Sequence, residues 1–231
     1  MSGLSGILRP EARSRKRPYD TAVVTVVEHP LAQDLLASLR DRETQPAVFR
    51  SLTRRLTLAL VLEATRDLET RVVNVTTPLE KTEGRRMGGE LVAVPILRAG
   101  LGMLEAVTDT FPAVSVGYIG LERDERTLEP TEYYEKLPPL EGKHALLLDP
   151  MLATGGSAAR AAKSILSKGP NSVRMICVVA APEGVRAMEE AHPEVPIFTA
   201  ALDRELNERG YILPGIGDFG DRLYGTEPGS A

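Results

Sequence analysis

A short polar stretch at the end of an apolar run is the part of this sequence whose residue types first suggest chemistry. Residues 149–157 read DPMLATGGS and directly follow the apolar run at 144–148. The stretch supplies a carboxylate, two hydroxyls and two adjacent glycines. It matches neither the G-x-x-x-x-G-K-[S/T] loop nor the G-x-G-x-x-G loop of common nucleotide sites, although it contains the same physical parts. We therefore treat it as a candidate ligand loop.

The second half of this stretch has the features of a phosphate cradle. Residues 153–157 would place several backbone N–H groups at the start of a helix, where the helix dipole favours an anion. Thr154 and Ser157 add hydroxyl donors, and the two glycines remove side chains that would hold a phosphate off the backbone. Asp149 would repel a phosphate but can accept hydrogen bonds from sugar hydroxyls. A phosphate that carries a ribose therefore suits both ends.

Helix capping is the simpler interpretation of the same residues. A threonine or serine at the start of a helix commonly accepts a hydrogen bond from the backbone, and an isolated Thr-Gly-Gly-Ser is more often a cap than a ligand site. Capping accounts for neither the adjacent glycines nor the acid that closes a buried strand. Both interpretations stay open at this point.

Apolar runs and helical stripes alternate along the rest of the chain. We expect strands or extended segments at 21–27, 72–75, 91–96, 113–119, 145–148, 172–180 and 197–201, and helices at 31–40, 45–68, 101–110, 157–167 and 184–191. Strands that are continuous apolar runs separated by helices are typical of a parallel sheet that is covered on both faces. The pattern predicts a single α/β domain over residues 21–231.

Polar and glycine residues follow several of the expected strands. In a parallel sheet, ligands bind beyond the carboxyl ends of the strands, so these residues predict one shared site. They are Arg98 to Gly102, the segment 120–140, the stretch 149–157, residues 181–184, Asp203 and the C-terminal GYILPGIGDFGDRLYGT. We expect 120–140 to be a loop, and its length suggests a functional one.

Composition and charge exclude several classes of protein. The chain has 231 residues, 42% of them apolar and 26% charged, which is typical of a globular domain. A net charge of −4 argues against nucleic-acid binding by bulk electrostatics. The single cysteine, Cys177, excludes an internal disulfide framework and predicts a cytoplasmic setting. No apolar run approaches the ~20 residues that span a bilayer, and the three histidines lack metal-ligand spacing.

Residues 1–20 form a separate basic segment. Its cationic residues are Arg9, Arg13, Arg15, Lys16 and Arg17, interspersed with serine, glycine and proline. This composition cannot build a packed core, so we predict a mobile basic arm. A solvated tail is the favoured interpretation, and an arm that touches RNA or targets an organelle is the alternative.

Three separated motifs resemble the uracil phosphoribosyltransferase family. LLLDPMLATGGS (146–157) is similar to the phosphoribosyl diphosphate (PRPP) signature of type I phosphoribosyltransferases, with Pro150 where most members carry a second acid. VPILRAGLGM (94–103) and GYILPGIGD (210–218) resemble family motifs, as does the loop ERDERTLEPTEYY (122–134). The resemblance covers about 29–226 and implies the type I phosphoribosyltransferase fold. That fold has a parallel central sheet, helices on both faces and a small C-terminal hood over the site.

The resemblance implies a role for each matched residue. Arg98 and Arg123 would contact diphosphate, Arg123 from a mobile loop, and with Asp149 on the ribose hydroxyls they form the catalytic set. The Arg98–Ala99 peptide is expected to be strained or cis. The remaining PRPP-binding residues would be Pro150, Met151, Leu152, Ala153, Thr154, Gly155, Gly156, Ser157 and Asp218, and the uracil-binding residues would be Ile212, Gly217, Asp218 and Phe219.

The implied reaction transfers the phosphoribosyl group of PRPP to uracil, which gives uridine monophosphate (UMP) and diphosphate in pyrimidine salvage. Mg²⁺ would be bound mainly through PRPP, so we expect no metal site built from protein side chains. Phe219 departs from the alanine that is frequent in bacterial members, which leaves the shape of the pocket wall open. The resemblance also suggests a homo-oligomer, either dimer or tetramer, and GTP as an effector.

Two alternatives remain for the activity. One is a phosphoribosyltransferase for purines or orotate, against which the motif at 210–218 argues. The other is a regulator that uses this fold to bind nucleotide and RNA. That role requires a basic face, and the balanced charge of the chain beyond the basic arm gives no indication of one.

Overall fold

The computed structural model describes residues 24–123 and 130–226. The predicted basic arm, residues 1–20, lies outside the described residues. Within them, a nine-stranded sheet has the order β1-β11-β10-β8-β4-β6-β7, with β5 beside β4 and β9 beside β10. Its strands are β1 (Val24–Val26), β4 (Leu91–Leu97), β5 (Ser115–Val116), β6 (Tyr118–Arg123), β7 (Pro130–Lys136), β8 (His144–Leu148), β9 (Met151–Leu152), β10 (Ser172–Ala180) and β11 (Ile197–Leu202). The pairs are parallel except β6–β7.

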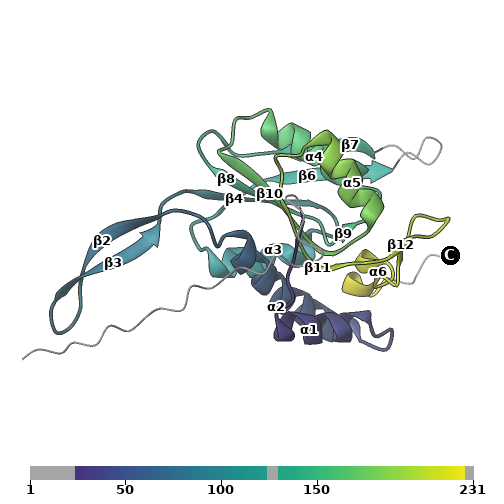
Figure 1. The fold of residues 1–231 in the computed structure, drawn as a ribbon, viewed down its shortest axis with the longest axis horizontal. Helices are drawn as coiled ribbons and strands as arrows, with labels where there is room; N and C mark the ends of the chain where they lie inside the picture. Colours follow the sequence, from purple (N-terminus) through teal and green to yellow (C-terminus); the bar gives the residue numbers. More distant parts are fainter. Residues whose placement is uncertain (1–23, 124–129, 227–231) are drawn as a thin grey trace, which may run out of the picture.

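Helices cover both faces of this sheet (Figure 1). One face carries α1 (Pro30–Arg40), α2 (Pro46–Ala64) and α3 (Leu101–Thr110), and the other carries α4 (Gly156–Leu166) and α5 (Pro182–Ala191). A proline opens α1, α2 and α5, where its missing N–H would have no helical partner. Along β4, Ala93 packs into one hydrophobic core while Val92 and Val94 pack into the other. The predicted parallel sheet with helices on both faces is confirmed.

The C-terminal part of the chain forms a small hood. It comprises β12 (Glu205–Leu206), β13 (Ile212–Leu213) and α6 (Phe219–Tyr224). Figure 1 shows β12 and α6 beside β9, at the edge of the sheet where the loop after β8 also lies. Helix α6 packs against α2, which attaches the hood to the first helical layer. The hood therefore brings the C-terminal glycine-rich motif to the edge that carries the candidate ligand loop.

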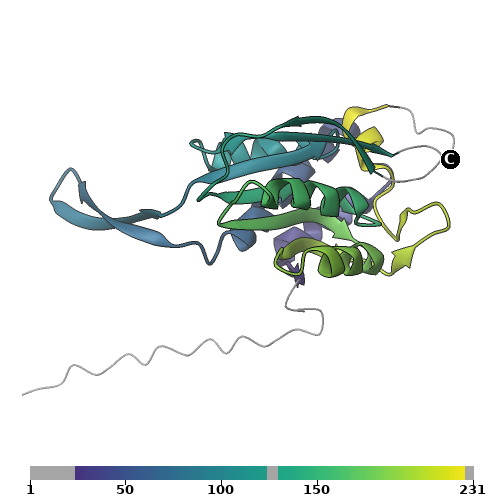
Figure 2. The ribbon, with the colours of Figure 1, turned by 90° about the horizontal axis from the view of Figure 1, so that it is seen from above.

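Two hairpins correct the sequence prediction. The expected loop at 120–140 is largely the antiparallel pair β6–β7, and the strand expected at 113–119 is divided between β5 and β6. A second hairpin, β2 (Thr70–Thr76) with β3 (Lys81–Met87), extends away from the body (Figure 2). Only 72–75 was predicted to be extended there. Strand β3 reads KTEGRRM and is mostly exposed, so it lacks the apolar alternation that marks a strand.

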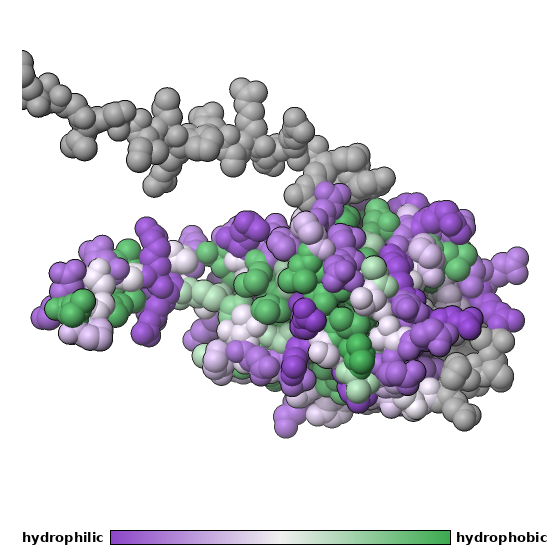
Figure 3. All heavy atoms as spheres, turned by 90° about the horizontal axis from the view of Figure 1, so that it is seen from below, coloured by the Kyte–Doolittle hydropathy of each residue, from purple (hydrophilic) through white to green (hydrophobic). Residues whose placement is uncertain are grey.

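Apolar side chains remain on the surface of the first helical layer. Val48, Leu58 and Leu62 on α2 are 52%, 39% and 56% exposed, respectively. Seen from below, apolar side chains gather over the middle of the body (Figure 3). Among the helices in the described ranges, none has both the length and the apolar character needed to cross a membrane.

Candidate active site

The candidate ligand loop lies at the start of α4 and encloses a small cavity. Asp149 follows β8 directly, and its Oδ1 accepts a hydrogen bond from Met151 N–H at 3.4 Å. The cavity has a volume of about 40 Å³. It is lined by Asp149, Met151, Leu152, Ala153, Thr154, Gly155, Ser157 and Ala158. Seven of these eight residues belong to the predicted PRPP-binding set, whereas Pro150 and Gly156 do not line the cavity.

Gly155 occupies the N-cap position of α4, so neither Thr154 nor Ser157 does. Its φ of +82° lies in the left-handed region that favours glycine. A Cβ atom there would lie 2.8 Å from both the Gly184 carbonyl oxygen and Ala187 Cβ of α5. The first N–H groups of a helix lack partners within the helix and attract anions. Helices α4 and α5 are thus in close contact at Gly155, and the start of α4 there is suited to binding a phosphate.

A larger cavity of about 280 Å³ adjoins the first one. It is lined by Met151, Ala153, Arg209, Gly210, Tyr211, Ile212, Gly217, Asp218 and Phe219. All four residues predicted to bind uracil are among them. Met151 and Ala153 line both cavities, so the loop after β8 and the hood meet at a common wall.

Two of the predicted uracil residues turn their side chains into the protein core. Ile212 is 4% exposed and Phe219 is 2% exposed, and both belong to the core beneath α1–α3. The Phe219 ring packs edge-on against Phe49 of α2, with 5.1 Å between ring centroids. What these residues can offer a ligand is therefore mainly their backbone. The bulk of Phe219, compared with an alanine, is accommodated in the core.

Asp218 lines the larger cavity and also begins α6. Its Oδ1 accepts a hydrogen bond from Asp221 N–H at 2.9 Å, which makes it the N-cap of this helix. Because it caps α6 and lines the cavity at the same time, the orientation of Asp218 is coupled to the hood. Its predicted contact with PRPP stays a prediction.

The loop after β4 corrects one detail of the prediction. The cis peptide bond joins Leu97 to Arg98, one residue before the expected position at Arg98–Ala99. The next residues form a hydrogen-bonded turn that leads into α3, in which the Arg98 carbonyl oxygen accepts the Leu101 N–H at 3.1 Å. Arg98 is exposed and lines neither of the two cavities.

Close packing nevertheless holds the Arg98 loop beside the end of β8. A Cβ atom on Gly100 would lie 2.4 Å from the Leu148 carbonyl oxygen, directly before Asp149. Tyr224 of α6 donates its hydroxyl to the Arg98 carbonyl at 3.0 Å. Burial raises the pKa of Tyr224, and the charge of Arg98 opposes that rise. Arg123 ends β6, and its side chain lies outside the described part of the structure.

Three residues of the larger cavity were absent from the predicted set. Arg209, Gly210 and Tyr211 line it from the turn between β12 and β13. Gly210 and Tyr211 begin the motif GYILPGIGD, so their position in the motif was the available signal. Asp203, expected at the rim, is instead 7% exposed and paired with Arg40.

A parallel sheet with helices on both faces, a phosphate-type loop after β8 and a hood that completes a second cavity define the type I phosphoribosyltransferase class. A family model described as uracil phosphoribosyltransferase matches residues 26–226. The chain belongs to the uracil phosphoribosyltransferase family.

Two relatives of this name agree with this assignment, and a solved structure shares the fold. The uracil phosphoribosyltransferase of Symbiobacterium thermophilum is 50% identical over 206 residues, which cover 88% of this chain and 99% of the relative. That of Dictyoglomus turgidum is 46% identical over 207 residues, 89% of this chain and 100% of the relative. The structure of the AQ2163 protein from Aquifex aeolicus is similar with a TM-score of 0.84 and 40% identity, and covers 88% of this chain and 98% of that one.

Proposed function

We propose that the protein transfers the phosphoribosyl group of PRPP to uracil at the site formed by the two adjoining cavities, and that it releases diphosphate. The observation that carries this proposal is the shared wall: Met151 and Ala153 line both the cavity at the start of α4 and the cavity under the hood. A phosphate and a base that are joined through one ribose need two such neighbouring sites. Family membership supports the same reaction.

The smaller cavity suits the 5′-phosphate and ribose of PRPP. The backbone N–H groups at the start of α4 would bind the phosphate, helped by the hydroxyls of Thr154 and Ser157. Asp149 lies at the other end of this loop and would accept hydrogen bonds from the ribose hydroxyls. Arg98, from the loop that packs against the end of β8, and Arg123, at the end of β6, would face the diphosphate, where guanidinium groups stabilise the charge of a leaving group.

The larger cavity suits the base. Uracil presents an acceptor, a donor and an acceptor at O2, N3–H and O4. Backbone groups of Ile212, Gly217 and Phe219 would match this edge, because the Ile212 and Phe219 side chains are buried elsewhere. The base nitrogen N1 would then attack carbon 1 of the ribose. In this arrangement the protein mainly orients the two reactants, an effect that can supply a large part of a rate enhancement.

Magnesium is the cofactor that we propose for this site. Mg²⁺ is commonly bound through substrate phosphates together with one or two carboxylates. Asp149 and Asp218 provide such carboxylates, one beside each cavity, so the residues present fit an ion that is carried by PRPP. When bound, it would supply positive charge to the departing diphosphate.

The activity is tested directly by incubating the protein with uracil, PRPP and Mg²⁺ and measuring UMP. We expect UMP to form, and its formation to stop when the metal is chelated and resume when Mg²⁺ is restored. Reactions without PRPP give the background. Product from hypoxanthine but none from uracil would refute the assignment of the base and leave the phosphate site standing.

Replacing Asp149 with asparagine tests the ribose contact. We expect Asp149→Asn to weaken PRPP binding by roughly 1.5–3 kcal/mol, the range for a hydrogen bond to a charged group. Asp109→Asn on the exposed part of α3 is a matched control that should leave PRPP affinity unchanged. The measurement is PRPP affinity by calorimetry. Unaltered affinity in a folded variant would mean that Asp149 serves only its own loop, through the Met151 N–H.

Several finer properties stay predictions. We propose a homo-oligomer, dimer or tetramer, which the exposed Val48, Leu58 and Leu62 on α2 support and which analytical ultracentrifugation would test. A GTP effector, a cytoplasmic setting and the division into an arm (1–20) and one domain (21–231) rest on the sequence and the family resemblance.

A further inference from the structure

We infer that Arg40, Asp203 and Arg222 are positioning residues that set base selectivity by holding the base-reading segment of the hood from behind. This segment is residues 212–219. The inference rests on the proposed function, in which the backbone at Ile212, Gly217 and Phe219 reads uracil. None of the three positioning residues lines the 280 Å³ base cavity, so each would act through the loop and not on the base itself.

The first clamp grips Gly215. Arg40 at the end of α1 binds both carboxylate oxygens of Asp203, with Nη2 at 2.6 Å from Oδ1 and Nη1 at 2.9 Å from Oδ2. Arg40 Nη1 also donates to the Gly215 carbonyl at 2.7 Å, and Asp203 Oδ2 accepts the Gly215 N–H at 3.0 Å. Both backbone polar groups of Gly215 are thus bound by one ion pair. The Asp203 side chain is 4% exposed and that of Arg40 is 25% exposed, so the carboxylate is shielded from water while the guanidinium is partly accessible.

The second clamp grips the next residue from α6. Arg222 Nη1 donates to the Ile216 carbonyl at 2.9 Å and to the Leu39 carbonyl at the end of α1, while Nη2 donates to the Asp41 carbonyl. The Arg222 guanidinium also lies 4.5 Å above the Phe49 ring of α2. Phe49 in turn packs on Phe219, at the far end of the base-reading segment.

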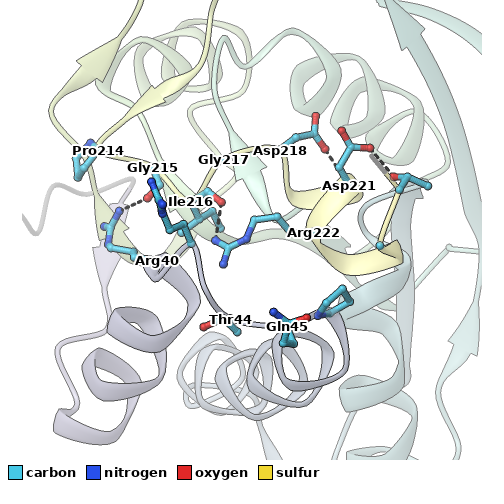
Figure 4. Close-up of a pocket in the computed structure, with 14 residues that line it drawn as sticks. Arg40, Thr44, Gln45, Pro214, Gly215, Ile216, Gly217, Asp218, Asp221 and Arg222 are labelled. Atoms are coloured by element: carbon cyan, nitrogen blue, oxygen red, sulfur yellow. Dashed lines mark hydrogen bonds between the residues drawn. The ribbon is translucent and has the colours of Figure 1, made fainter. Parts of the chain in front are cut away.

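The two residues that follow the clamped ones form a thin wall. Gly217 and Asp218 line the base cavity on one side and a second cavity of about 490 Å³ on the other. Figure 4 shows this second cavity, with Arg40 and Arg222 reaching toward the loop from α1 and α6. The clamps hold Gly215 and Ile216 directly before the wall, and Phe49 packs on Phe219 directly after it. If a clamp were loosened, the wall would have space behind it into which to move.

Movement of this wall should affect the base more than PRPP. A side chain can change rotamer to keep a hydrogen bond, but a backbone donor or acceptor cannot. A peptide group that shifts therefore loses its hydrogen-bond geometry to the base. The phosphate loop, by contrast, is built from β8, α4 and α5, whose described contacts include none with Arg40 or Arg222. Because the wall includes Asp218, which we propose to face PRPP, the expected signature is a loss of uracil recognition that is much larger than the loss of PRPP recognition.

The test uses Arg40→Lys and Arg222→Lys in the full chain. Lysine keeps the charge but concentrates its donors on one nitrogen, so it cannot span the separated oxygens that Nη1 and Nη2 of each guanidinium bind. For each variant we expect KM for uracil to rise about tenfold or more and the uracil-to-cytosine ratio of kcat/KM to fall about tenfold or more, because unmatched hydrogen-bonding groups control such ratios. KM for PRPP should rise severalfold less than KM for uracil.

Arg54→Lys is the matched control. Arg54 pairs with Glu105 across α2 and α3 at 2.8 Å, and the two side chains are 46% and 64% exposed. Arg54 lines neither the base cavity nor the cavity at the start of α4. This variant should leave both KM values and the base ratio unchanged. Uracil and PRPP constants that change together, or not at all, in folded Arg40→Lys and Arg222→Lys would overturn the inference.

Two further measurements keep the outcome decisive. Hydrogen exchange of the Gly215 amide in the unaltered protein needs no substitution: we expect strong protection, and exchange as fast as at an exposed amide would overturn the clamp even if a lysine variant fails to fold. Gly217→Val separates this inference from the proposed function. If Gly217→Val leaves uracil use intact, the base site itself is misplaced; if it abolishes uracil use while the lysine variants behave like Arg54→Lys, only the clamp is refuted.

Discussion

Replacing Gly155 with valine should lower kcat/KM for PRPP by about a hundredfold or more while the sheet stays folded. Gly155 has a φ of +82°, which a β-branched residue adopts only at considerable cost. The new Cβ would also lie 2.8 Å from Ala187 Cβ and from the Gly184 carbonyl oxygen, so α4 must move away from α5. Misplacement of a binding group by ~1 Å can cost about 100-fold in rate.

Gly169→Val provides a close control for this prediction. Gly169 has a φ of +69°, follows the other end of α4 and has no atom within 4 Å of an added Cβ. It shares the backbone strain of Gly155, worth about 1–2 kcal/mol, without the clash or the site. Steady-state kinetics with varied PRPP should show near-normal kcat/KM for Gly169→Val. Equal loss in both variants, or normal PRPP use in folded Gly155→Val, would contradict the phosphate site.

The second large effect concerns the choice of base. Cytosine presents an acceptor and a donor where uracil presents a donor and an acceptor, so buried peptide groups would face like partners. A site built for hydrogen bonding can reject such an analogue by ~10⁴-fold, and we expect strong rejection of cytosine by the unaltered protein. Ile212→Val should barely change this ratio, because the peptide remains and only a buried methylene is lost.

Gly217→Val should instead damage uracil use itself. The nearest atom to an added Cβ is Arg222 Cδ at 3.6 Å, an ordinary contact, so the obstacle is the φ of +74°. Gly142→Val, at φ +73° with open space around it and outside both cavities, is the control for strain alone. The measurement is kcat/KM for uracil and cytosine. A collapse of the ratio in Ile212→Val together with normal uracil turnover in Gly217→Val would refute backbone reading.

Much of the secondary structure and the order of the ligand loops follow from the sequence alone. The strand predicted at 172–180 and the helix predicted at 101–110 have the bounds of β10 and α3. The reason is local: a strand buried on both faces is a continuous apolar run, and a helix against a sheet repeats its apolar residues every three or four positions. The glycine-containing segments at 98–102, 149–157 and 210–218 were likewise recognisable in the sequence, and they identified the family.

The tertiary structure decided which of those segments meet. Met151 and Ala153 come to line both cavities through the parallel crossovers, which no local pattern encodes. The side chain of Phe219 enters the core because α6 packs on α2. Asp203 forms one half of the first clamp because Arg40, the last residue of α1, lies next to it in the fold. Arginine and aspartate are usually exposed, so composition predicts a surface role for both. Long-range packing alone places these two charges together beneath Gly215.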